Sequence, residues 1–177
     1  MGIKIGIDPS GTGTTAIVIY LKLLNDNAYK INERGEFTSK NWREHFGWIK
    51  WFIMSNECLI YSLFSKYIPP EGKHILNFEN CLYTNANGSK DRDDLLRLLG
   101  ALEKEYKNRK NFNWVSPKHT KSVVKNMENL SKYNDNCLWK YEKDNNLTYQ
   151  YRKGWKYNND KISNHLRDAI IIANYEN

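Results

Sequence analysis

The feature that most constrains this sequence is a pair of β-rich runs near its N-terminus, separated by a short turn. Ile3, Ile5 and Ile7 alternate with smaller or polar residues, and a second β-rich run covers residues 16–20. A turn rich in Pro, Ser, Gly and Thr separates the two runs, which predicts a β-hairpin. Asp8 ends the first strand, where a rigid backbone could hold a charged group close to a ligand. Asp8 could equally cap the turn through backbone N–H groups, as Asp residues often do.

The remaining chain alternates β and α patterns. In chain order, the sequence predicts a strand at 28–37, an amphipathic helix at 41–67, a strand at 74–80, a helix at 91–106, a strand at 112–117 and a helix at 160–175. The segment 126–160 is predicted to be mostly irregular or locally ordered on binding. This order predicts one α/β domain over residues 1–177, with three strands in a meander and further strands completing a mixed sheet.

Composition narrows the classes of partner. Lys and Arg number 27 against 20 Asp and Glu, a net charge of +7, which favours nucleic acid first and an anionic membrane surface second. The chain is also rich in Asn, Lys, Ile and Tyr, a bias that AT-rich coding alone produces, so charge does not decide the question. The longest apolar stretch, at 48–64, contains Lys50 and Glu57, which excludes a membrane span.

The cysteines indicate neither a disulfide framework nor a zinc site. Cys58, Cys81 and Cys137 are far apart and odd in number, and no His lies at zinc-ligand spacing from them. We therefore expect a reducing, cytoplasmic compartment.

Acidic residues stand at matching positions of three predicted elements. Asp8 ends the first strand, Glu79 ends the fourth, and Asp168 follows His165 by three residues, on the same face of the last helix. If the first and fourth strands are parallel neighbours, their acids leave the sheet at one edge, and the last helix could bring Asp168 to them. Clustered carboxylates repel each other unless a divalent cation binds them, and oxygen ligands suit Mg²⁺ or Mn²⁺.

Each of these residues also has an ordinary structural explanation. Glu79 could be a strand-end carboxylate without a function, and His165 a packed or exposed helix residue. Asp168 could simply pair with its neighbour Arg167. The order of the acids along matching elements, rather than any one of them, favours a metal site.

The ordered set of motifs resembles a known family. The sequence "IGIDPS" with its Gly/Thr turn, an acid closing the fourth strand, the segment "SPKHTKSVV" at 116–124, "LLGAL" at 98–102 and a terminal "HLRDA" are similar to Holliday-junction resolvases of the RuvC type, within the ribonuclease H-like superfamily. The resemblance touches most of the chain except 126–160. It implies a ribonuclease H-like fold, with a five-stranded mixed sheet in which strands 1–3 are antiparallel and the later strands parallel, flanked by helices.

The resemblance also implies an activity and its residues. The activity is that of a crossover junction endodeoxyribonuclease, a structure-selective enzyme that nicks branched DNA by two-metal-ion hydrolysis, with two Mg²⁺ ions per active site and Mn²⁺ as a substitute. Asp8, Glu79, His165 and Asp168 fall on metal-binding and catalytic positions. Lys121 matches a catalytic basic residue near the scissile phosphate, although a plain surface lysine is the alternative.

Further residues are predicted to contact DNA. Lys118 and Lys121 lie in the matched segment, and the basic, aromatic stretch 140–161 contains Arg152, Lys153 and Lys156. Cations that contact phosphate beside rings that stack on bases suit a branched substrate; the alternative is a solvated loop.

The sequence departs from the bacterial members of the family at two places. Leu82 stands where they place an aromatic wedge, with Tyr83 next to it as a candidate DNA contact. The segment 126–160 also exceeds the bacterial form. Both features favour the bacteriophage branch, with four-way, three-way and flap structures as substrates in the cytoplasm of a bacterium or a phage-infected host.

Two other functions are compatible with parts of this pattern. Actin-like kinases share the "GIDxG-T" turn but need two such lobes. A catalytically silent branched-DNA binder would keep the fold and the basic surface.

The proposed activity also predicts an oligomeric state. Symmetric nicking of a two-fold symmetric junction calls for two active sites, so a homodimer is expected. The resemblance assigns the dimer contact to the leucine-rich helix 91–107.

Overall fold

A mixed sheet forms the centre of the fold in this computed structural model, which describes residues 2–23, 26, 28–64, 73–80, 90–129, 138 and 140–176. Within these residues, the sheet contains β1 (Gly2–Asp8), β2 (Thr14–Lys22), β3 (Lys30–Thr38), β4 (Lys73–Glu79) and β5 (Phe112–Val115), in the order β3-β2-β1-β4-β5. β1, β2 and β3 are antiparallel, whereas β1–β4 and β4–β5 are parallel pairs. The predicted fold class is therefore confirmed.

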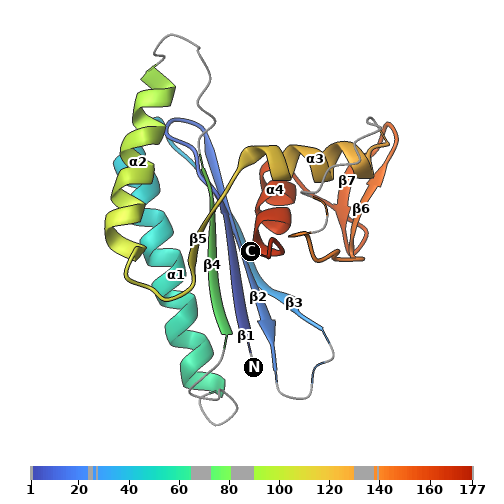
Figure 1. Ribbon diagram of the computed structural model, residues 1–177, viewed down its shortest axis with the longest axis horizontal. Helices are drawn as coiled ribbons and strands as arrows, with labels where there is room; N and C mark the ends of the chain where they lie inside the picture. The colour runs from blue at the N-terminus through green and yellow to red at the C-terminus, as the bar shows by residue number, and fades with distance from the viewer. Residues whose placement is uncertain are drawn as a thin grey trace.

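Two helices cover one face of this sheet. α1 (Trp42–Phe64) and α2 (Lys90–Tyr106) lie side by side on the left of the sheet in Figure 1. The inward residues of β1, Ile3, Ile5 and Ile7, pack with apolar residues of both helices in one buried cluster. Successive side chains of a strand point to opposite faces, so the odd-numbered residues of β1 face this core and the even-numbered residues face the other side of the sheet.

The other face of the sheet is covered by α4 (Asn164–Ala173), with α3 (Pro117–Met127) beside it (Figure 1). Gly6 of β1 lies directly against the backbone of α4. A Cβ atom on residue 6 would lie 2.1 Å from the carbonyl oxygen of Ala169 and 2.4 Å from the backbone nitrogen of Ala173. The absent side chain of Gly6 therefore lets α4 lie directly on β1.

A second small sheet packs against the outer side of α4. In the described part of the chain it consists of β6 (Leu147–Gln150), β7 (Gly154–Tyr157) and β8 (Asp160–Lys161), all antiparallel. The prediction of a mostly irregular segment at 126–160 is wrong for these residues. Leu147, Trp155 and Tyr157 are buried against Ile170 of α4, so burial of apolar rings orders this basic segment without DNA.

The other predicted elements agree with the structure to within a few residues, with one omission. The predicted strand 112–117 ends at Val115 because Pro117 begins α3, whose N-cap is Ser116. Pro favours the first position of a helix, where its missing N–H has no partner to lose. α3 is absent from the prediction. No described helix has the combination of length and apolarity that a membrane crossing requires.

Candidate active site

The candidate site begins with Asp8, which ends β1 on the face that α4 covers. Its side chain is 12% exposed, and its Oδ2 lies 2.9 Å from Nδ1 of His165, near the start of α4. This hydrogen bond is the main cause of a raised pKa of His165, and the charge of Asp8 adds to it, while partial burial acts against it. The imidazole and the carboxylate therefore form a charge-assisted pair across the gap between β1 and α4.

Glu79 lies next to Asp8 because β1 and β4 are parallel neighbours. Their register pairs Ile7 with Phe78, so the two acids end adjacent strands at the same edge. Burial raises the pKa of Glu79 to about 8, and the negative charges of Asp8 and Asp168 contribute to the increase. The nearby hydroxyl of Thr120 acts in the opposite direction. Glu79 therefore holds its proton at neutral pH while the cluster is without a cation.

Asp168 enters the same cluster from α4, but its carboxylate already has a partner. Arg167 Nε donates to Oδ1 at 2.7 Å and Nη2 donates to Oδ2 at 2.9 Å. Burial raises the pKa of Asp168, and the guanidinium counteracts this increase. Asp168 therefore does pair with its neighbour Arg167, which is the ordinary structural explanation that the sequence offered for it.

Arg167 and Thr120 were not among the predicted site residues. Arg167 is held by Asn164, whose Oδ1 accepts from Nη1 at 3.0 Å, and by the ring of Trp155, 5.2 Å from the guanidinium carbon. The only sign of the role of Arg167 in the sequence is its position next to Asp168. That position does not determine the direction in which a long side chain points.

The structure brings the four predicted acid and imidazole groups to one edge of the sheet, but as pairs. Asp8 contacts His165, Asp168 contacts Arg167, and the carboxylates of Asp8, Glu79 and Asp168 influence one another electrostatically. Among the described residues, no set of three or more His, Cys, Asp or Glu side chains could hold a metal ion as it stands. The arrangement is an acidic cluster in which one carboxyl is neutralised by a proton and another by an arginine.

The predicted basic residues of α3 flank this cluster. Thr120 is buried and acts on the pKa of Glu79, so the N-terminal half of α3 lies beside the fourth strand's acid. Lys118 and Lys121 are exposed on either side of Thr120 in the helix. Both lysines are therefore available to a polyanion that approaches the acidic edge.

The remaining predicted DNA contacts occupy different environments. Arg152 and Lys153 are exposed in the turn between β6 and β7, whereas Lys156 is half-buried within β7, opposite Thr148 and Lys161. Tyr83 and Leu82, the candidates for an aromatic wedge, lie outside the described residues.

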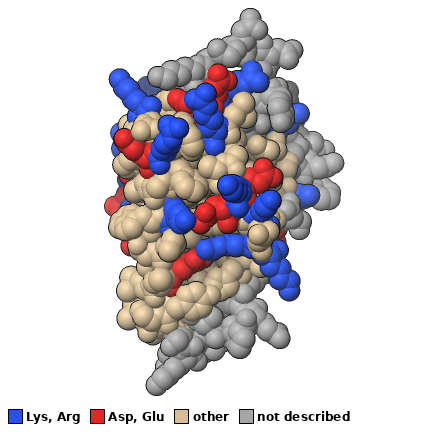
Figure 2. Space-filling view, turned by 90° about the vertical axis from the view of Figure 1, so that its left-hand side faces the viewer, with Lys and Arg blue, Asp and Glu red and all other residues tan. Residues whose placement is uncertain are grey.

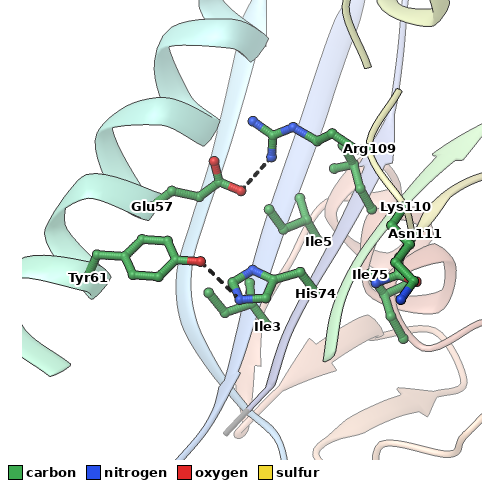
Figure 3. A pocket seen from close by; sticks show the side chains of 10 residues that line it. Ile3, Ile5, Glu57, Tyr61, His74, Ile75, Arg109, Lys110 and Asn111 are labelled. Carbon is green, nitrogen blue, oxygen red and sulfur yellow. Dashed lines mark hydrogen bonds and ion pairs between the residues drawn. The ribbon is translucent and has the colours of Figure 1, made fainter. Parts of the chain in front are cut away.

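A cavity of about 400 Å³ lies at the opposite end of the strands and does not have the chemistry of an active site. Four of its polar side chains pair with each other (Figure 3): Tyr61 and His74 are hydrogen-bonded at 3.1 Å, and Arg109 Nη1 donates to Glu57 at 2.7 Å. Burial lowers the pKa of His74, which favours the neutral form of its ring.

The α1–α2 face, which we define as the outward side of these two helices, carries uncharged areas between mixed charges. Figure 2 shows Lys and Arg side chains interspersed with Asp and Glu on it. The helix 91–107 was predicted to form the dimer contact, but its leucines Leu98, Leu99 and Leu102 are buried within the chain. Most of the exposed large apolar side chains of this face lie on α1, and α2 adds Leu96: Trp51, Met54, Leu59, Tyr61, Leu63 and Leu96. An apolar contact on this face would therefore be made mainly by α1.

Comparison with known proteins identifies the fold. No protein-family model and no curated protein matches the chain. Among solved structures, Thermus thermophilus RuvC in complex with Holliday junction substrate superimposes with a TM-score of 0.52 at 12% identity, covering 98% of this chain and 90% of that one. Another structure of Thermus thermophilus RuvC gives a TM-score of 0.50 at 13% identity, covering 97% and 90%. The resemblance to RuvC in the sequence is thus confirmed in the fold, which is ribonuclease H-like.

Proposed function

We propose that this protein is a metal-dependent endonuclease that nicks branched DNA, such as Holliday junctions, by two-metal-ion phosphodiester hydrolysis. The observation that carries the proposal is the clustering of Asp8, Glu79 and Asp168 at one edge of a RuvC-like sheet, close enough for each to change the pKa of Glu79. Like charges on one buried carboxylate, Asp8, and two half-buried ones, Glu79 and Asp168, repel each other. A fold retains such a cluster at a cost in free energy unless a cation binds there.

The donor set suits a hard divalent cation. Asp8, Glu79 and Asp168 offer carboxylate oxygens and His165 an imidazole nitrogen, which match Mg²⁺ and Mn²⁺. Such ions would supply activation of a water molecule and charge neutralisation at the leaving oxygen of the phosphodiester.

The chain's own residues have defined tasks in this proposal. With a cation present, Glu79 would release to solvent the proton that burial and Asp8 hold on it, and Asp168 would offer its carboxylate to the cation in place of Arg167. Arg167 is then free to contact a phosphate. Lys121 supplies a positive charge near the scissile phosphate, where charge develops in the transition state.

The proposed substrate and assembly follow from the same geometry. Lys118 and the turn residues Arg152 and Lys153 offer exposed cations for the DNA backbone. A homodimer through the α1–α2 face would present two active sites to a two-fold symmetric junction, with exposed residues such as Trp51 forming the contact. Membership of the bacteriophage branch and a cytoplasmic location stay predictions from the sequence.

The decisive experiment is cleavage of a synthetic four-way junction in the presence of Mg²⁺ or Mn²⁺. We expect paired nicks from the wild type, none from Asp8→Asn, and unchanged nicking by Asp93→Asn, which removes an exposed carboxylate of α2. Junction binding by Asp8→Asn should persist. Cleavage by Asp8→Asn at the wild-type rate would contradict the proposal.

A catalytically silent branched-DNA binder is the second candidate, and one observation favours it. The Arg167–Asp168 ion pair occupies a carboxylate that a metal site would need, with both oxygens engaged. Calorimetric titration with Mn²⁺ separates the two functions: a silent binder shows junction affinity without metal binding.

A further inference from the structure

One aromatic ring of the basic segment 140–161 is left outside the core. Trp155 and Tyr157 are each 4% exposed, and Tyr141 and Tyr149 are half-buried against the same apolar cluster. Tyr151 is 76% exposed. Four of the five rings therefore stabilise the fold, and the only one free to contact a ligand is Tyr151.

Tyr151 lies at the tip of the β6–β7 hairpin, where the backbone is well defined. The turn is closed by a hydrogen bond in which the N–H of Lys153 donates to the carbonyl of Gln150 at 3.0 Å. Arg152 and Gly154 have φ angles of +63° and +84°, as tight hairpin turns require. The guanidinium carbon of Arg152 lies 5.4 Å from the centre of the Tyr151 ring. The turn therefore presents a ring, a guanidinium and the ammonium of Lys153 together.

The hairpin is anchored next to the candidate site. Within β7, Trp155 packs its ring against Arg167, and its Nε1 donates to Glu128 at 3.1 Å. Arg167 in turn binds Asp168. The hairpin thus contacts α4 one residue from the acidic cluster.

The tip points toward the end of the molecule that carries the cluster. At the base of the hairpin, Tyr157 lies near Asp144, which accepts a hydrogen bond from Tyr20 at 2.7 Å. Tyr20 pairs with Lys4 in the sheet, whereas the partner of Ala16 is Asp8. The base is therefore level with the middle of β1, and the tip extends in the direction of its Asp8 end, on the side of the C-terminal end of α3 in Figure 1.

We propose that Tyr151 is a specificity-determining residue that stacks on an unpaired base at the branch point, while Arg152 and Lys153 contact the adjoining phosphates. This inference rests on the proposed function. In a continuous duplex each base is already stacked on both sides, so an exposed ring finds a free base face only at a branch, a flap or an end. Stacking by Tyr151 therefore favours branched DNA over duplex DNA, whereas Arg152 and Lys153 increase the affinity for any DNA.

The test compares the affinities of a labelled four-way junction and of a linear duplex of the same sequence, by fluorescence anisotropy without divalent cations. Tyr151→Ala should weaken junction binding by roughly 5- to 150-fold, the range for loss of one base–aromatic stack, and leave duplex binding unchanged. Tyr151→Phe should retain junction preference. Asn32→Ala, which shortens an exposed side chain of β3, should behave as the wild type.

The outcomes separate this inference from the proposed function. If the wild type prefers the junction and Tyr151→Ala prefers it equally, the role of Tyr151 is wrong and the proposed function stands. If Tyr83→Ala loses the preference while Tyr151→Ala keeps it, the role belongs to the loop after β4 instead. If the wild type binds duplex and junction equally, the proposed function fails and the inference fails with it. Because Tyr151 is 76% exposed, Tyr151→Ala and Tyr151→Phe should keep the wild-type melting temperature, which circular dichroism verifies.

Discussion

The raised pKa of Glu79 predicts that Glu79→Gln stabilises the metal-free protein, and does so more strongly as the pH rises. In the folded chain the carboxyl titrates near pH 8, against an ordinary value of 4.5. The folded state therefore binds this proton more tightly than the unfolded state does. The resulting stabilisation is fully present below pH 4.5 and is lost as the pH rises toward 8. Gln keeps the shape of the protonated acid and does not titrate.

The size of the effect follows from the two pKa values. Each unit of difference corresponds to about 1.4 kcal/mol, so a fully expressed shift from 4.5 to about 8 corresponds to ~5 kcal/mol. Between about pH 5 and pH 7.5 the wild type should lose ~3 kcal/mol of unfolding free energy through Glu79 alone. The stability difference between Glu79→Gln and the wild type should widen by this amount.

Urea unfolding in EDTA at several pH values between 5 and 7.5 measures this difference. Glu103→Gln, which changes an exposed carboxylate of α2, is the matched control and should show no widening. A gap between Glu79→Gln and the wild type that stays constant over this range would refute the reasoning, because Glu79 would then be ionised or protonated alike in both states. Added Mn²⁺ should stabilise the wild type at pH 7.5 more than it stabilises Glu79→Gln.

Three further predictions concern metal, DNA and assembly. Asp8→Asn should lower Mn²⁺ affinity in a calorimetric titration, and equal binding by both proteins would contradict the metal site. Replacing Arg152, Lys153 and Lys156 by Ala should reduce the slope of log junction affinity against log salt by roughly 2–3 units; an unchanged slope would place the DNA elsewhere. Trp51→Glu should convert a dimer to a monomer in sedimentation velocity, because it puts a charge into an apolar contact. A wild type that cleaves junctions as a 21.0 kDa monomer would exclude the dimer.

The sheet and the meeting of Asp8 with Glu79 were predictable because the underlying signals are long and simple. β1 and β2 have strong apolar patterns, and α1 extends over 23 residues. Neighbouring parallel strands end at the same edge of a sheet. If β1 and β4 are parallel neighbours, as the structure shows, the acids at their C-terminal ends lie side by side. The convergence of His165 on Asp8 followed from packing the last helix across this edge.

The second sheet was hidden by the shortness of its strands. β6 and β7 have four residues each, so β7 shows only Trp155 and Tyr157 as inward positions, within a segment rich in Lys and Asn. α3 was hidden because Pro117 is compatible both with the end of a strand and with the first turn of a helix. The Arg167–Asp168 pair depends on side-chain conformation, which neighbouring positions in a sequence do not specify.

Because Gly6 contacts α4, a substitution at Gly6 would change the distance between Asp8 and the groups on α4 without replacing any of those groups. α4 carries His165 and Asp168, and β1 carries Asp8, so the separation of these groups depends on how closely the helix lies on the strand. A methyl group at position 6 would have to move from 2.1 Å to at least 3.0 Å from the Ala169 oxygen, which displaces the helix by roughly 1 Å. Graded substitutions there, first Ala and then Ser, would yield a series of variants with every proposed catalytic residue intact and a stepwise wider site. Such a series measures how much positional error the reaction tolerates, a quantity that deletion of a carboxylate does not reveal.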